Sequence, residues 1–286
     1  MNPDRQRRAM MLGAAAAGLG LLLPARVRAA APFASRRIAV TVRGTVRGEG
    51  RDVLLIPGLA SGPAIWNRQV AGLPGYRYHL MQAGGFAGLP PGPNATGPLL
   101  APLADEIARY VREAGLKRPA VVGHSMGGTL AMMLGIRGLA GRVMVVDMLP
   151  AGAAMVGGTA SGVGYLADQL SHYFTGTKAG RAYLARMVAQ APGAQGSDPD
   201  VIANALRDLA NIDLAPQLAR IAAPLRVVYA VGADQRVASE IGQRFRSAYA
   251  GKKGATLLPI GPSGHVIMAD QPARFTAALR DFLKGG

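Results

Sequence analysis

Short, predominantly apolar runs recur along this chain, several of them bounded by glycine or proline. A continuous apolar run predicts a strand buried on both faces, as in a parallel sheet covered by helices. Between several runs, apolar residues spaced three to four apart predict helices, most clearly over 99–114 and 275–283. Alternating strands and helices favour an α/β fold with a mostly parallel sheet. The predicted strands are 38–42, 53–56, 78–82, 119–122, 143–146, 225–231 and 256–260.

This alternation stops between Leu149 and Ala223, where no strand-like run occurs. Helical patterns over 164–174, 181–189 and 201–209 lie there instead. We interpret residues 150–222 as a helical insertion, and long insertions of this kind commonly form lids. Connecting helices without a gating role are the alternative. The core of the predicted fold is then 30–149 together with 223–286.

The first 29 residues have the three parts of a secretory signal peptide: a charged start, an apolar centre over 9–23 and a small-residue end at Ala29. The apolar centre is shorter than the roughly 20 residues of a spanning helix. Arg7 and Arg8 directly before it indicate the twin-arginine route, which exports folded proteins. We therefore expect a periplasmic or secreted protein that begins near Ala30 and has no stable membrane anchor.

The composition excludes several classes of site. With no Cys, the chain has no disulfides, thiolate metal sites or Cys nucleophile, and isolated His residues and the lack of a phosphate-loop lysine predict no metal and no cofactor. The formal charge of +16 comes mostly from Arg scattered singly. A specific nucleic-acid partner is not expected without a clustered basic face, although salt-sensitive binding to anionic polymers stays open. Nothing in the sequence indicates the oligomeric state.

One short motif, Gly-x-Ser-x-Gly centred on Ser125, points to a nucleophile. It directly follows the predicted strand 119–122 and precedes a helical segment over 129–136. Such a turn raises the hydroxyl above the carboxyl end of the sheet, at a helix N-terminus whose N–H groups can receive an oxyanion. The flanking Gly123 and Gly127 lack the Cβ atoms that would clash in so tight a turn.

With this motif in place, the sequence resembles the α/β-hydrolase superfamily over essentially all of the mature chain. The resemblance implies a serine nucleophile, a base and an acid in the chain order Ser, Asp, His. It also implies an oxyanion hole formed by the backbone N–H groups of Leu59 and Met126. The matching segments are 55–59, 123–128, 146–147, 228–237 and 264–265.

Four histidines are candidates for the base. His124 adjoins the nucleophile and resembles a structural residue of the family, and His79 lies within a predicted buried strand. His172 falls in the insertion, where it could line a pocket or simply pack. His265 follows the last predicted strand in a glycine-containing loop and matches the position of the base, so we predict that it fills this role.

Two aspartates are candidates for the acid that orients the base, and both satisfy the chain order. Asp234 follows the predicted strand 225–231, where the family more often places the acid. Asp147 ends the strand 143–146, a position that a minority of related enzymes use. We favour Asp234 and expect Asp234→Asn to abolish turnover while Asp147→Asn spares it.

These residues predict acyl transfer through a covalent acyl-enzyme. We expect hydrolysis of carboxylic esters with small or medium apolar acyl groups, with Trp66 either walling the acyl pocket or packing in the core. Cleavage of amides, lactones or thioesters, or transfer to another acceptor, remains an alternative. A ligand-binding protein that keeps the pocket without useful turnover is another.

Overall fold

The computed structural model describes residues 33–45, 51–152 and 194–285, with five isolated positions between the last two ranges. All of them lie in one compact unit within Phe33–Gly286. The expected leader, His172 and the expected helices 164–174 and most of 181–189 lie outside the described residues. Within the described ranges, no helix combines the length and hydropathy needed to cross a bilayer.

Seven strands form a single sheet in the order β1-β3-β2-β4-β5-β6-β7. Strand β1 runs antiparallel to β3, and every other pair is parallel. Each strand lies within two residues of a range predicted from the sequence, which confirms the mostly parallel sheet. The strands are β1 (Ile38–Arg43), β2 (Asp52–Ile56), β3 (Arg77–Ala83), β4 (Ala120–His124), β5 (Arg142–Val146), β6 (Leu225–Ala230) and β7 (Thr256–Ile260).

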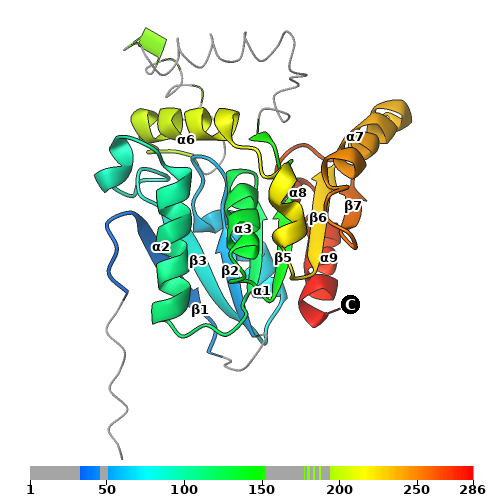
Figure 1. The fold of residues 1–286 in the computed structure, drawn as a ribbon, viewed down its shortest axis with the longest axis horizontal. Helices are drawn as coiled ribbons and strands as arrows, with labels where there is room; N and C mark the ends of the chain where they lie inside the picture. The colour runs from blue at the N-terminus through cyan, green and yellow to red at the C-terminus, as the bar shows by residue number, and fades with distance from the viewer. Residues whose placement is uncertain are drawn as a thin grey trace, which may run out of the picture. The chain divides into compact units, whose positions relative to one another are not determined.

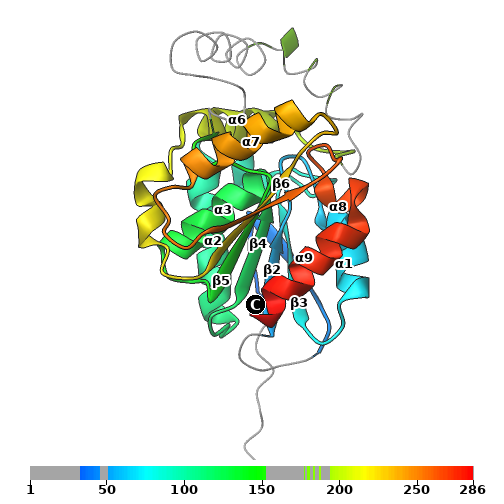
Figure 2. The same ribbon diagram turned by 90° about the vertical axis from the view of Figure 1, so that its right-hand side faces the viewer.

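Helices cover both faces of this sheet (Figures 1 and 2). Helices α2 and α3 lie on one face, and α1, α8 and α9 lie on the other. The described helices are η2 (Pro63–Trp66), α1 (Asn67–Gly72), η3 (Gly92–Ala95), α2 (Leu100–Glu113), α3 (Met126–Ile136), α6 (Pro199–Asn211), η5 (Ala215–Arg220), α7 (Gln235–Ala248), α8 (Ile267–Asp270) and α9 (Pro272–Lys284).

The continuous apolar runs are buried because successive side chains of a strand enter opposite layers. In β2, Leu54 and Ile56 join the core on the α2 and α3 side. Val53 and Leu55 join the core on the α9 side, which also contains Phe275. The same strands contribute side chains to the cores on both faces of the sheet. This packing keeps the sheet rigid, so residues at its carboxyl edge are held in fixed positions.

The described part of residues 150–222 contains α6 and η5, and α6 lies across the carboxyl end of the sheet (Figure 1). The Asp208 carboxylate on α6 accepts hydrogen bonds from the N–H groups of Leu99 (2.6 Å) and Leu100 (2.8 Å) at the start of α2. The Asn204 amide donates to the carbonyls of Asn94 and Ala95. This segment is therefore fastened to the core by polar contacts at both of these positions.

Candidate active site

Ser125 occupies the turn between β4 and α3 with φ +53°, a conformation that non-glycine residues rarely adopt. Its N–H donates to the carbonyl of Val146 at 2.9 Å, which fixes the turn against the end of β5. A Cβ on Gly123 would lie 1.9 Å from the carbonyl oxygen of Gly127, and a Cβ on Gly127 would lie 2.2 Å from that of Ile56. Both glycines are therefore required by close backbone approach, as the motif predicted.

His265 pairs with a buried aspartate at the end of β5. Its Nδ1 lies 2.6 Å from Oδ2 of Asp147, whose other oxygen accepts the N–H of Ala230 at 2.9 Å. Asp147 is only 8% exposed and has φ +50°. The carboxylate is thus held from two sides, and it selects the histidine tautomer with hydrogen on Nδ1 and a free lone pair on Nε2.

Asp234, the acid favoured from the sequence, does not contact His265, and this expectation is corrected. It is exposed and caps α7, with Oδ1 accepting the N–H of Val237 at 2.9 Å. The sequence does contain a signal for this capping role, because an Asp three residues before the first apolar position of a helix is a typical N-cap. No comparable pattern reveals the left-handed turn at Asp147.

His124 links the nucleophile turn to the backbone of His265. Its Nε2–H donates to the His265 carbonyl at 2.9 Å, and the two ring centroids are 4.7 Å apart. Burial, together with the nearby His265, lowers the pKa of His124 to about 4. The ring is therefore neutral near pH 7 and holds the loop of His265 beside Ser125. No hydrogen bond joins the Ser125 hydroxyl to His265 among the described contacts, and such bonds are often long without substrate.

The oxyanion donors expected from the resemblance lie at one corner of this site. Met126 begins α3, so its N–H has no helical acceptor, and Leu59 lies in a turn after β2. A Cβ on Gly58 would lie 3.1 Å from the Cβ of Ser125, which brings this turn close to the nucleophile. Neither N–H donates to another described residue.

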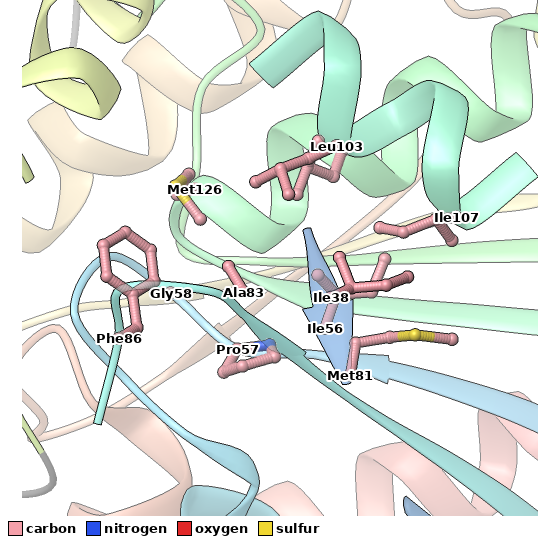
Figure 3. A pocket seen from close by; sticks show the side chains of 11 residues that line it. Ile38, Ile56, Pro57, Gly58, Met81, Ala83, Phe86, Leu103, Ile107 and Met126 are labelled. Atoms are coloured by element: carbon pink, nitrogen blue, oxygen red, sulfur yellow. The ribbon is translucent and has the colours of Figure 1, made fainter. Parts of the chain in front are cut away.

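Beneath this corner lies a small apolar cavity of ≈ 10 Å³, measured as the space open to the centre of a water molecule. Figure 3 shows Leu103 and Ile107 of α2 reaching toward Ile38 and Ile56, with Met126 nearby. A cavity of this size holds about one water, so an acyl chain does not fit there as the side chains stand. The cavity is the apolar floor of the site.

The positions of Trp66 and His79 show that both side chains belong to the core. Trp66 is fully buried against Phe275, with ring centroids 6.1 Å apart, so it packs in the α9-side core and does not line this cavity. His79 is 2% exposed, and its Nε2 lies 3.0 Å from Oδ1 of Asp52. It is a satisfied core residue, as predicted. In the described part of the chain, no group of three acidic, His or Cys side chains could hold a metal ion.

Comparison with known families agrees with this architecture. The model of the alpha/beta hydrolase family matches residues 53–278, from β2 into α9. The chain belongs to the alpha/beta hydrolase family. It is therefore a hydrolase.

Solved structures similar to this hydrolase share its fold at low sequence identity. A hydrolase from Pseudomonas aeruginosa is 18% identical with a TM-score of 0.66, covering 87% of this chain and 94% of that one. An esterase from Exiguobacterium antarcticum is 20% identical with a TM-score of 0.66, covering 87% and 96%. An enol-lactonase from Burkholderia xenovorans is 18% identical with a TM-score of 0.62, covering 86% and 96%. No curated protein sequence matches this hydrolase.

Proposed function

We propose that this protein is a serine hydrolase that cleaves carboxylic esters through Ser125, His265 and Asp147. The observation that carries the proposal is the 2.6 Å contact between His265 and Asp147, beside a serine held at φ +53°. A nucleophile on a strained turn, a histidine and a buried carboxylate that orients it are the parts of a serine catalytic triad.

Each side chain then has one role. The Nε2 lone pair of His265 takes the proton of the Ser125 hydroxyl as the oxygen attacks the ester carbonyl. Asp147 keeps Nδ1–H in place and stabilises the imidazolium that forms. His265 next gives this proton to the departing alcohol, which leaves Ser125 acylated. Water, activated by the same histidine, hydrolyses the acyl-enzyme and restores the free hydroxyl.

The negative charge that develops on the carbonyl oxygen needs donors that are already in place. The N–H groups of Leu59 and Met126 donate to no other residue in the described part of the chain, and their side chains take no part in this role. Removal of one donor of this kind typically costs about 3–4 kcal/mol of transition-state stabilisation. The proposed donors come from two loops, so the relative position of these loops controls the reaction.

The side chains beside Met126 are apolar, which favours substrates with small or medium apolar acyl groups. Because the cavity itself holds about one water, the acyl group has to bind outside it or displace its lining. Lactones are the second candidate, because a lactone is a cyclic ester cleaved by the same steps and an enol-lactonase shares the fold. A panel of p-nitrophenyl esters of increasing chain length, with a matched panel of lactones, separates the two substrate classes.

A fluorophosphonate probe tests the nucleophile directly. We expect labelling of the purified protein at Ser125, located by peptide mass spectrometry, and its loss in Ser125→Ala and His265→Ala. Hydrolysis of the esters should be lost in the same two variants. A folded, monodisperse protein that neither reacts with the probe nor hydrolyses any ester would contradict the proposal and favour a ligand-binding protein.

We also propose that the chain is exported through its first 29 residues. The support is the sequence alone: Arg7 and Arg8 precede an apolar segment that ends at Ala29. Cell fractionation should find the processed protein outside the cytoplasm, and replacement of both arginines by lysine should retain it inside. Unchanged export of the double variant would exclude the twin-arginine route.

A further inference from the structure

The hydroxyl of Ser197 joins two loops that are far apart in the sequence. It donates to the carbonyl of Ala60 at 3.0 Å and accepts the N–H of Ala87 at 2.9 Å. With one bond on each side, the direction of the hydroxyl hydrogen is fixed. Ser197 lies just before α6, in the insertion, whereas Ala60 follows the proposed oxyanion donor Leu59.

The residue that Ser197 contacts is strained. Gly58 to Ser61 form a tight turn in which the Ser61 N–H donates to the Gly58 carbonyl at 3.2 Å. Ala60 is the third residue of this turn and has φ +56°, where type II turns usually have glycine. A side chain persists in such a conformation only when its surroundings hold it there. The same turn sets the direction of the Leu59 N–H.

Ser197 is itself positioned by the loop that follows β3. The Asp198 N–H donates to the Gly85 carbonyl at 2.7 Å, and the Gly88 N–H donates to the Gly196 carbonyl at 3.3 Å. A Cβ on Gly85, which has φ +90°, would lie 2.4 Å from a methyl group of Val201. The 85–88 loop therefore lies in close contact with the start of α6, and the Ser197 hydroxyl has little freedom to leave Ala60.

We propose that Ser197 is a positioning residue for the oxyanion hole. By holding the Ala60 carbonyl, its hydroxyl keeps the 58–61 turn in the conformation that aims the Leu59 N–H at the developing oxyanion. The inference rests on the proposed function and adds a role for the insertion: its segment before α6 is part of the catalytic scaffold. Ser197 touches no reacting atom and acts only through Ala60.

Three variants test this role. Ser197→Ala removes both hydrogen bonds, Ser197→Thr restores a hydroxyl, and Asp208→Ala removes a different tether of the same segment that does not contact Ala60. For Ser197→Ala we expect kcat to fall by about 10- to 100-fold with KM within about twofold of the wild type. The affinity of a trifluoromethyl ketone, which forms a tetrahedral oxyanion on Ser125, should weaken by the same factor, while the affinity of the product acid stays unchanged.

Ser197→Thr should recover most of kcat, and Asp208→Ala should keep the wild-type kcat and ketone affinity. Wild-type kcat in Ser197→Ala, or a loss of similar size in Asp208→Ala, would overturn the proposal. Hydrogen exchange at the Ser61 N–H, which donates to the Gly58 carbonyl across the turn, gives a readout that needs no turnover. It should be faster in Ser197→Ala, and unchanged exchange would also overturn the proposal. Absence of ester hydrolysis in the wild type would instead reject the proposed function.

Discussion

The loops that follow β5 and β6 lie side by side at the carboxyl edge of the sheet, and each contains an aspartate. Asp147 comes directly after β5, is 8% exposed and pairs with His265. Asp234 comes four residues after β6, is exposed and caps α7. Topology makes these positions nearly equivalent, whereas the local backbone makes them different: one carboxylate faces the base and the other faces a helix N-terminus.

Two backbone hydrogen bonds join the Asp147 loop to the end of β6. The Ala230 N–H, at the end of β6, donates to the Asp147 carboxylate, and the Asp147 N–H donates to Val228 of the same strand at 2.7 Å. The end of β6 thus supplies a backbone donor to Asp147, which follows β5. The aspartate that follows β6, Asp234, instead caps helix α7. The position of an acid in the sequence does not decide its role without the hydrogen bonds around it.

Exchange of each aspartate for asparagine gives the largest contrast. Asp147→Asn should lower kcat by about 10⁴-fold, because an amide no longer selects the correct histidine tautomer. Asp234→Asn should keep kcat within about twofold, since asparagine also caps helices well. Steady-state hydrolysis and the rate of fluorophosphonate labelling both measure this contrast. If Asp234→Asn were the inactive variant, the acid would be on the β6 loop and the pairing described here would not operate in catalysis.

His124 holds His265 from the backbone side, and its pKa predicts a pH dependence of stability. A histidine in the unfolded chain has a pKa near 6.5, against about 4 for buried His124. Between these values the unfolded chain binds more protons, so stability is full above about pH 6.5 and falls as pH drops toward 4. The difference corresponds to about 3 kcal/mol in the free energy of unfolding.

Urea unfolding of the wild type and His124→Gln at pH 7, 5.5 and 4 measures this effect. Glutamine does not titrate but can still donate to the His265 carbonyl, so the variant should lose less stability on acidification. Burial also lowers the pKa of His79, although hydrogen bonding to Asp52 opposes the shift. That contribution is common to both proteins and cancels in the comparison. Parallel pH curves for the two proteins would show that His124 is not the titrating group.

The helix-capping role of Asp234 predicts a smaller change, in stability alone. Asp234→Ala should lower the free energy of unfolding by about 1 kcal/mol because the Val237 N–H loses its acceptor. Asp234→Ser, which can cap, should keep most of this stability. Thermal unfolding of both variants provides the test, with ester hydrolysis as the control. A drop in kcat without a drop in stability would contradict the capping role.

Tyr249 supports the loop that contains Asp147 and predicts a small effect on turnover. Its buried hydroxyl donates to the Met148 carbonyl at 2.7 Å, one residue beyond the acid. Tyr249→Phe leaves this carbonyl unpaired and should cost about 1–2 kcal/mol of stability. We expect kcat to change by less than about threefold, since Ala230 and His265 still hold the Asp147 carboxylate. A large loss of kcat at unchanged stability would show that Tyr249 positions the acid.

The sequence predicted the strands well because burial on both faces leaves an unmistakable pattern, as in Val53 to Ile56. It also predicted the Ser125 turn, since Gly123 and Gly127 mark close backbone approach. The choice between two acids could not be made in the same way, because it depends on the left-handed turn at Asp147. The Ser197 tether left no pattern either: a hydrogen bond across 137 residues has no periodicity.

The pairing of Asp147 with His265 also has a consequence for the order of events during synthesis of the chain. The two residues are 118 positions apart, which a ribosome spans in on the order of 10 s. A growing chain therefore carries its serine and its carboxylate well before its base exists. In the proposed mechanism hydrolysis needs His265, which follows β7, so no hydrolysis is expected until this last part of the chain has been synthesised.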